Sequence, residues 1–284
     1  MVYDLLDLHF LGAENLIGTF LLDLEVGLAL VDCGPASTVE TLERRLADID
    51  LEVGDLRHIL VTHVHFDHAG AAGLLVARNP GIRVHVSESG APHLADPSRL
   101  EKSARRLYGE SFDELWGDIV AVPAENIEVA DKTVCGLECF PTPGHARHHI
   151  SFMNDEGMLF GGDVTGLRLV PSDHVLPTTP PPDIDLEAWH LSLDEIERRV
   201  PDLLALPHYG VVNEPELHLA AFRQRLMLWA ERVRRGISEE DFVAEARAEL
   251  DPQEDIERLE QMFVLQHSYF GLRRYWDKLP EDAA

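Results

Sequence analysis

The chain has 284 residues, 45% of them hydrophobic, and its 51 acidic against 24 basic side chains give a formal net charge of −27. A surface this acidic repels nucleic-acid backbones, so no nucleic-acid partner is expected, although a bound metal ion can attract a phosphodiester even in an acidic protein. Because no apolar stretch approaches the ~20 residues that span a bilayer and the N-terminus has no signal-peptide pattern, we expect a cytoplasmic protein without a membrane partner.

The first part of the chain alternates between strand and helix patterns. Short apolar runs punctuated by glycine predict strands over Leu8–Leu11, Thr19–Leu24, Leu28–Asp32, Arg57–Val61 and Ile82–Val86. Apolar residues at helical spacing predict helices over Ser37–Ile49, Ala69–Arg78, Pro97–Tyr108 and Phe112–Trp116.

The next part repeats this rhythm and then becomes helical. Strands are predicted over Lys132–Val134, Leu137–Pro141, Ile150–Asn154, Met158–Phe160 and Leu203–Leu206. Five prolines make residues 171–183 a stiff loop. Helices are predicted over Leu186–Arg199 and Leu217–Arg235, from Ser238 onward, and over Ile256–Trp276. Two mixed sheets with helices outside them fit this order, an α/β (α+β) class, with residues 1–213 as the sandwich domain and 214–284 as a helical extension packed on it.

The most informative segment is Val61–Gly70, which packs three histidines and an aspartate behind a predicted strand. Side chains two apart on a strand share a face, so His63 and His65 can converge on one ion. Asp67 and His68 follow where the chain turns toward a helix, and they can face a second position beside the first. Imidazole and carboxylate ligands suit zinc and, less selectively, iron or manganese.

Three further candidates sit in turns that leave predicted strands, each with glycine nearby: His145, Asp163 and His208. The order of motifs, THVHFDH, then TPGH, GGD and a late histidine, with Asp32-Cys33-Gly34 ahead of them, resembles the metallo-β-lactamase superfamily over roughly residues 8–210. The resemblance implies a four-layer αββα sandwich. It also implies two divalent metal ions: His63, His65 and His145 hold one, Asp67, His68 and His208 hold the other, and Asp163 bridges them.

The family members that hydrolyse β-lactams generally carry cysteine where this chain has Asp163, so the complete ligand set is more similar to glyoxalase II, lactonases and related ester hydrolases. The implied activity is hydrolysis of a small ester, thioester or lactone by a metal-bound hydroxide. Related proteins leave two alternatives: a mononuclear iron persulfide dioxygenase, and a phosphodiesterase or nuclease. The acidic composition argues against the nuclease.

We also expect roles other than metal binding for several residues. Asp67 is a candidate for proton transfer to the leaving group, and Tyr209, directly after a ligand, for oxyanion stabilisation. Asp32 and Thr62 are candidates to orient the imidazoles.

The other histidines are weighed mainly as structural residues. His148 and His149 are ambiguous, and for His149 a hydrogen-bonded structural role is favoured over catalysis. Four others could form substrate walls, but surface or core packing is favoured for each: His85, His93, His174 and His190. The three cysteines are expected to be reduced and simply packed.

Substrate choice is expected to come from three segments outside the ligand set: Ser87–Trp116, loop 171–183 and the helical tail. The basic stripe Arg99–Arg106 either faces the metals and receives an anion or is solvated. Apolar residues of the tail, Leu226, Trp229, Val233 and Met262–Leu265, are expected to pack on the sandwich, and a homodimer is the other use of that surface.

Overall fold

The computed structural model describes residues 2–250, 256–257, 259–260 and 263–279. Its first sheet has six strands in the order β1-β2-β3-β4-β5-β6. The pairs β1·β2 and β2·β3 are antiparallel, and the later pairs are parallel. The strands are β1 Val2–Asp7, β2 Gly18–Leu24, β3 Gly27–Val31, β4 Leu56–Leu60, β5 Arg83–Val86 and β6 Ile127–Val129.

The second sheet also has six strands, in the order β14-β13-β10-β9-β8-β7. Only β10 and β13 pair in parallel; the other pairs are antiparallel. The strands are β7 Thr133–Val134, β8 Leu137–Pro141, β9 Ile150–Met153, β10 Met158–Phe160, β13 Leu203–Leu206 and β14 Gly210–Val212. A separate hairpin pairs β11 Leu167–Leu169 with β12 His174–Leu176.

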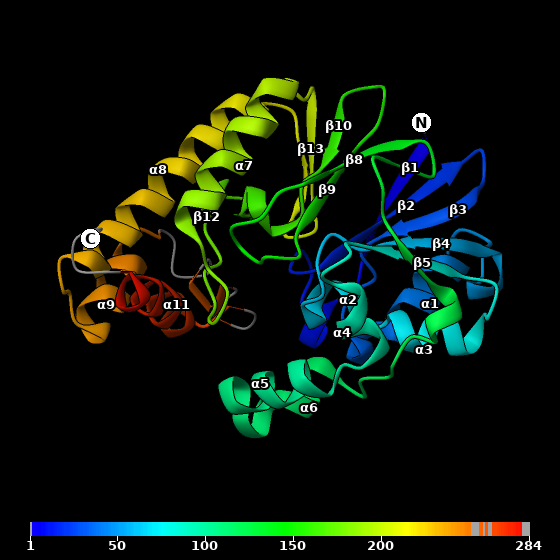
Figure 1. Cartoon of the computed structure of the whole chain (residues 1–284), viewed down its shortest axis with the longest axis horizontal. Coiled ribbons are helices and arrows are strands. Elements are labelled where there is room, and N and C mark those ends of the chain that lie inside the picture. The colour runs from blue at the N-terminus through cyan, green and yellow to red at the C-terminus, as the bar shows by residue number, and fades with distance from the viewer. Residues whose placement is uncertain (1, 251–255, 258, 261–262, 280–284) are drawn as a thin grey trace.

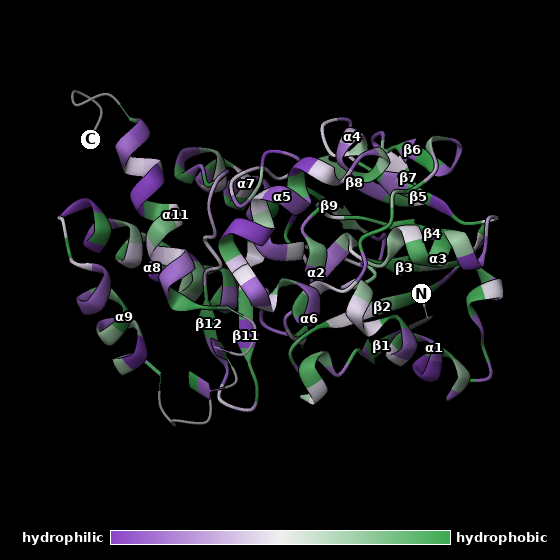
Figure 2. Cartoon of the chain, turned by 90° about the horizontal axis from the view of Figure 1, so that it is seen from below, coloured by the Kyte–Doolittle hydropathy of each residue, from purple (hydrophilic) through white to green (hydrophobic). Residues whose placement is uncertain are grey.

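The helices described are mostly short and lie outside the sheets (Figure 1). They are α1 Val39–Ala47, α2 Phe66–Ala69, α3 Ala72–Arg78, α4 Ala91–Ala95, α5 Ser98–Tyr108, α6 Phe112–Trp116, α7 Leu186–Arg199, α8 Pro215–Arg234, α9 Glu239–Ala248 and α11 Leu265–Lys278. In Figure 2 the strands are coloured mainly as hydrophobic, whereas α5 and α11 carry many hydrophilic residues. Among the described residues, no helix is long and apolar enough to cross a bilayer.

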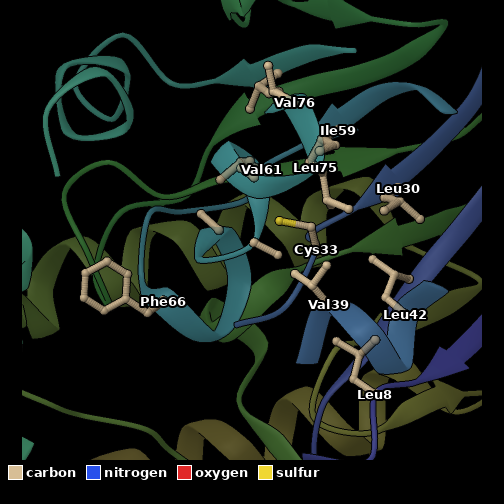
Figure 3. Close-up of a cluster of buried hydrophobic side chains, with 14 of the residues drawn as sticks. Leu8, Leu30, Cys33, Val39, Leu42, Ile59, Val61, Phe66, Leu75 and Val76 are labelled. Carbon is tan, nitrogen blue, oxygen red and sulfur yellow. The ribbon is translucent and has the colours of Figure 1, made fainter. Parts of the chain in front are cut away.

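Three apolar clusters divide the molecule into layers. The sheets face each other through one of them, where Phe20 of β2 meets Phe160 of β10 edge to face at 5.5 Å between ring centroids. On the outer side of the first sheet, α1 and α3 bury their apolar stripes against β3 and β4, as Leu42, Leu75 and Ile59 do in Figure 3. On the outer side of the second sheet, α7 and α8 bury their apolar residues in the third cluster. The αββα sandwich is therefore confirmed.

The C-terminal helices pack on the second sheet's helical layer. Leu226, Trp229 and Val233 of α8 are buried in the same apolar cluster as α7 and β13, as is Leu265, so packing of these tail residues is confirmed; Met262 lies outside the described residues. Gly271 of α11 touches the proline-rich loop so closely that a Cβ there would lie 1.9 Å from the carbonyl oxygen of Thr179. The division into 1–213 and 214–284 stays a prediction.

Some element predictions are wrong. Leu8–Leu11 is no strand: the strand is Val2–Asp7, and Phe10–Gly12 is a 3-10 turn with Leu11 at a φ of 51°. The strands β6 and β14 are missed because each is short. The segment 171–183 is not loop throughout, because His174–Leu176 pairs with Leu167–Leu169. The helix predicted over Ile256–Trp276 is interrupted at Val264, whose backbone is extended before α11 begins.

Candidate metal centre

The seven predicted ligands meet where strands of both sheets end. His63 and His65 follow β4, and Asp67 and His68 lie on the short helix α2 that comes next. The second sheet supplies the other three: His145 after β8, Asp163 after β10 and His208 after β13. Six of the seven are buried, and His65 is half-buried. The sandwich thus brings together ligands from four separate segments of the chain at one edge, residues 63–68, His145, Asp163 and His208.

Three imidazoles form the first group. Nδ1 of His65 lies 3.0 Å from Nε2 of His63 and 2.9 Å from Nε2 of His145. Nitrogen atoms this close hold either a shared proton or a metal ion between them, because two bare lone pairs facing each other repel. The three nitrogen atoms lie within 4.8 Å of one another, a spacing that suits a shared metal ion.

The second group contains two imidazoles and two carboxylates. Nε2 of His68 lies 3.2 Å from Nε2 of His208 and 3.7 Å from Oδ2 of Asp67. Asp163 belongs to both groups, because its Oδ1 lies 3.1 Å from Nε2 of His68 and its Oδ2 lies 3.5 Å from Nε2 of His145. A carboxylate shared by the two groups, with one oxygen near each, is the arrangement expected of a ligand that bridges two metal ions.

Two of the ligand imidazoles are oriented by a backbone carbonyl on their other ring nitrogen. Nδ1 of His145 donates to the carbonyl of Thr178 and Nδ1 of His208 to the carbonyl of Leu16, both at 2.9 Å. These bonds fix the tautomer and leave Nε2 as an electron-pair donor, which is how proteins prepare histidine for a metal.

Asp32 and Thr62 orient two more of the imidazoles, those of His68 and His63. Asp32 Oδ2 lies 2.8 Å from Nδ1 of His68, and the backbone N–H of Thr62 donates to Asp32 Oδ1 at 2.8 Å. The Thr62 hydroxyl lies 3.1 Å from Nδ1 of His63. The predicted contacts of both residues with ligand imidazoles are therefore present.

The donor set fits a metal ion. Oδ1 of Asp163 is buried, yet it accepts no well-aligned hydrogen bond from any residue in the described part of the chain. Burial and then neighbouring imidazoles hold the pKa of His63 well below its usual value, so this ligand is neutral. Burial opposes a charge on Asp163, but His68 and His208 outweigh it and hold the pKa of Asp163 well below its usual range. Burial likewise opposes a charge on His68, but Asp163, Asp67 and Asp32 outweigh it and hold the pKa of His68 well above its usual value, so a proton lies here between imidazole and carboxylates where a divalent ion would take its place.

Two glycines permit the close approach that this edge requires. A Cβ at Gly144, whose φ is +143°, would lie 2.4 Å from Cα of Trp189, so the turn carrying His145 can rest on α7 only without a side chain. At Gly162, with a φ of +53°, a Cβ would lie 2.7 Å from the Thr62 hydroxyl. Glycine at these positions lets both ligand-bearing turns reach the site.

A cavity of about 390 Å³ opens over the cluster. His65, Asp67, His145 and Asp163 line its base. Its walls come from α5 and α6, from Thr178–Pro182 of the proline-rich loop, and from the tail, including Phe263 and α11. All three segments that are expected to set substrate choice contribute to the lining of this cavity, and their selection of a substrate stays a prediction.

Tyr209 is not brought into this cavity. Its ring lies beside Gly18, where a Cβ would be 3.2 Å from Cε2 of Tyr209, and its hydroxyl hydrogen-bonds Asp7. The peptide that follows His208 directs the tyrosine away from the metal cluster. The oxyanion role predicted for Tyr209 therefore has no geometric support.

The sequence analysis missed Tyr108, the last residue of α5, which does line the cavity. Its ring packs edge to face on Trp116 and His267 with centroids 5.1 and 5.2 Å away. Burial and the charges of Asp67 and Asp163 raise the pKa of Tyr108, so the phenol keeps its proton. The one sequence feature that could have indicated a role for Tyr108 is its position at the end of a predicted helix.

The remaining histidine candidates lie beside the site. His149 stacks on His63 at 4.9 Å between centroids, and its Nδ1 is 2.9 Å from the hydroxyl of Thr142, in keeping with the favoured structural role. His148 lies 6.2 Å from His63, and burial lowers the pKa of His148 to about 3. His93 contacts His148 with centroids 6.0 Å apart. None of the three lines the cavity over the cluster.

The basic stripe divides between cavity and surface. Arg106 lines the cavity, whereas Arg105 turns outward, pairs with Glu101 at 2.9 Å and Asp113 at 2.8 Å, and lies over the ring of Phe112. Lys102 is exposed. Part of the stripe therefore faces the site and the rest is solvated.

Comparisons with known proteins agree with this arrangement. Residues 19–208 match the metallo-beta-lactamase superfamily. The chain is 29% identical over 202 residues to the metallo-beta-lactamase fold-containing protein ST1585 of Sulfurisphaera tokodaii, covering 66% of this chain and 75% of that protein. It is 28% identical over 151 residues to the hydroxyacylglutathione hydrolase GloC of Haemophilus influenzae, covering 50% and 63%. It spans about half the length of other curated relatives, such as 49% of the probable metallo-hydrolase YqjP of Bacillus subtilis.

Solved structures share the fold. The crystal structure of ST1585 from Sulfolobus tokodaii superposes with a TM-score of 0.69 at 23% identity, covering 91% of this chain and 93% of that one. TTHA1429 from Thermus thermophilus gives 0.68 at 21% identity, covering 97% and 93%. Since the superfamily match runs over residues 19–208 and so takes in more than half of the chain, this chain belongs to the metallo-beta-lactamase superfamily.

Proposed function

We propose that this metallohydrolase cleaves a small ester, thioester or lactone and works with two divalent metal ions, zinc in preference to iron or manganese. The observation that carries the proposal is the double ligand group at the base of the cavity, with one Asp163 oxygen directed to each group. A ligand cluster that opens onto a cavity leaves coordination positions free for water or substrate, which is the arrangement of catalytic metal sites.

When bound, two such ions would supply a hydroxide nucleophile at neutral pH and a Lewis acid for the substrate carbonyl. The protein contributes the positions of the groups around them. Because partners on the second ring nitrogen of His145 and His208 hold these imidazoles in place, the site is assembled before the substrate arrives. The relative named as a hydroxyacylglutathione hydrolase supports including thioesters in the substrate class.

Asp67 is the residue we propose for proton transfer. It lies in the second group, 3.6 Å from Nε2 of His208, and also lines the cavity, so it borders both the ligands and the substrate space. Its carboxylate can take a proton from the attacking water and return it to the leaving oxygen or sulfur, the general acid–base role that hydrolysis needs.

Tyr108 replaces Tyr209 as the candidate hydroxyl donor. It lines the same cavity as Asp67 and Asp163 and keeps its proton because burial and these carboxylates raise its pKa. A phenol donates a hydrogen bond to an oxygen that gains negative charge, and a protonated donor is already in the required state. We therefore propose that Tyr108 stabilises the oxyanion of the substrate.

The cavity walls support a substrate with an acidic group. Arg106 of α5 and Arg274 of α11 both line the cavity, and neither forms an ion pair with another residue in the described ranges. Their neighbours in the wall, such as Leu100 and Trp116, are apolar. In a chain with a net charge of −27, two unpaired guanidinium groups at one cavity favour an acyl compound with an apolar part and a carboxylate or similar anion.

The alternative functions differ in whether they need the second group of metal ligands. A mononuclear iron persulfide dioxygenase requires one metal position, and the complete group of Asp67, His68, Asp163 and His208 favours two. A phosphodiesterase or nuclease stays less favoured because the chain is acidic. Cytoplasmic action on a small molecule, without nucleic-acid or membrane partners, is part of the proposal, and a homodimer stays a prediction.

The proposal is tested with a panel of lactones, thioesters, phosphodiesters and a persulfide, using the metal-loaded protein and Asp67→Ala. We expect hydrolysis of at least one lactone, ester or thioester, with a large loss in the variant. Oxygen consumption with the persulfide would favour the dioxygenase. If Asp67→Ala equalled the wild type on every substrate that is turned over, the mechanism would be wrong.

A further inference from the structure

A second group of metal-binding side chains lies apart from the metal centre and its cavity. His58 is in β4, His85 is in β5, and Cys135 is in the turn between β7 and β8. One nitrogen or sulfur atom from each lies within 4.8 Å of the other two. None of the three belongs to the seven-residue cluster or to the cavity lining.

The distances within this group approach those of a zinc site. Nδ1 of His58 lies 3.0 Å from Nε2 of His85, and Sγ of Cys135 lies 3.7 Å from the same His85 nitrogen. Ligands of a tetrahedral zinc ion with ordinary zinc–nitrogen and zinc–sulfur bonds lie roughly 3.3 to 3.6 Å apart. The two distances to His85 are therefore within a few tenths of an ångström of these values, and the third pair, His58 and Cys135, lies within 4.8 Å.

Both imidazoles are also oriented as metal ligands usually are. Oε2 of Glu128 in β6 lies 3.7 Å from Nδ1 of His85, the nitrogen that does not face the other two ligands. His58 hydrogen-bonds the backbone of Val26. Oxygen partners on the outer side of ligating imidazoles are the recurring support of protein metal sites.

The position gives such an ion a structural consequence. β4 and β5 belong to the first sheet, whereas the turn that carries Cys135 belongs to the second. Cys135 also packs against the apolar core between the sheets. Three ligands from both sheets therefore lie together at the margin of the sandwich, and a bound ion would join the layers there.

Access is open as well. His85 is buried, but His58 and Cys135 are each half-buried, so an ion can reach the group from solvent and a water molecule can complete its coordination. A hydrogen bond between His58 and His85 alone would explain one of the contacts. It would not explain a thiol directed at the same nitrogen.

We propose that His58, His85 and Cys135 form a further metal site, separate from the seven-residue metal centre. It binds zinc or a similar divalent ion and links the two sheets. On binding, the thiol of Cys135 releases its proton to solvent, and its sulfur and the two imidazole nitrogens each form one coordination bond to the divalent ion, with no change of oxidation state. The site is independent of the proposed hydrolysis.

Cobalt absorption tests this directly, because the seven-residue centre contains only nitrogen and oxygen ligands. The full chain is stripped of metal and titrated with Co²⁺, and a sulfur-to-cobalt charge-transfer band in the near ultraviolet is recorded. We expect the band in the wild type and in Cys139→Ser, a matched change at a cysteine outside the group, and its loss in Cys135→Ser.

Metal content provides a second readout that does not depend on the spectrum. Elemental analysis after zinc loading and desalting should give one ion per chain fewer in Cys135→Ser and in His58→Gln than in the wild type. Zinc should also raise the unfolding temperature of the wild type more than that of Cys135→Ser. The proposal is overturned if the wild type lacks the thiolate band, if Cys135→Ser retains it, or if the variants bind as much zinc as the wild type.

Discussion

The carboxylate of Asp32 and the imidazole of His68 are both buried, and Asp32 Oδ2 lies 2.8 Å from His68 Nδ1. Asp32 is itself anchored by the backbone N–H and the hydroxyl of Thr62, which joins the strand β4 to the second ligand group. The contact directs His68 Nε2 toward Asp163 and His208 and increases its electron density for a metal ion.

Asp32→Asn should therefore weaken metal binding at the second group by about 10- to 100-fold, because the amide cannot supply the same negative charge to His68. Competition with a chromophoric chelator measures the effect. Asp50→Asn is the matched control, since Asp50 is exposed and shares the positive φ of Asp32, 59° against 55°. Equal metal affinities in the two variants would remove the role we assign to Asp32.

We expect opposite results from removing the hydroxyl group of Tyr108 and that of Tyr209. Tyr108→Phe should lower kcat by about 100-fold, the usual effect of removing one oxyanion donor, with little change in metal content. Tyr209→Phe should leave kcat unchanged, because its hydroxyl bonds Asp7 outside the cavity. The comparison is made on whichever lactone or thioester the wild type hydrolyses. A loss of kcat in Tyr209→Phe alone would reverse the assignment.

We expect Arg106 and Arg274 to favour substrates that carry a negative charge. Arg106→Ala and Arg274→Ala should each raise KM about tenfold for an acidic substrate, the loss of one charge-assisted hydrogen bond, and should leave a neutral substrate of the same size unaffected. Lys102→Ala removes a charge from the same helix as Arg106, but away from the cavity, and should have no effect. An equal rise for acidic and neutral substrates would instead indicate a change in cavity shape.

His218 should make stability depend on pH. Its Nε2 lies 2.8 Å from the carbonyl oxygen of Thr165, and burial lowers the pKa of His218 from 6.5 to about 4. As pH falls from 6.5 toward 4, the unfolded chain takes up a proton that the folded chain does not, so folding stability decreases. Above that window both states are neutral and the effect is absent.

His218→Gln keeps a donor for Thr165 but cannot be protonated. The variant should lose about 2 kcal/mol less free energy of unfolding than the wild type between pH 7 and pH 4.5. Urea unfolding at the two pH values measures this, and the metal-binding histidines are common to both proteins. Parallel losses in the two proteins would show that His218 does not titrate as described.

The sequence predicts the metal cluster well because its geometry depends on strand ends. His63 and His65 lie just beyond the end of β4 rather than on it, so they converge through the loop that leaves the strand, and motif order then predicts that His145, Asp163 and His208 join them. The contacts of Asp32 and Thr62 also follow from their places in those motifs. Strands of the sandwich are found where apolar runs are continuous, as in β2 and β3.

What the sequence does not predict depends on contacts between distant segments. β1 carries Asp4 and Asp7 three residues apart, which breaks the alternation typical of a strand, yet it pairs with β2 along its whole length. Tyr108 gains its position from α5, α6 and the tail together. Likewise, His85 and Cys135 are interpreted from sequence as packed residues, and only the approach of the two sheets brings them within reach of one another.

Metal stoichiometry tests the central claim most directly. It is measured by elemental analysis on Cys135→Ser protein, so that the site between the sheets does not contribute, with and without the further change His208→Ala. The account predicts two ions per chain in the first protein, and one ion with loss of hydrolysis in the second. One ion per chain in both, with unchanged hydrolysis, would contradict a two-metal hydrolase.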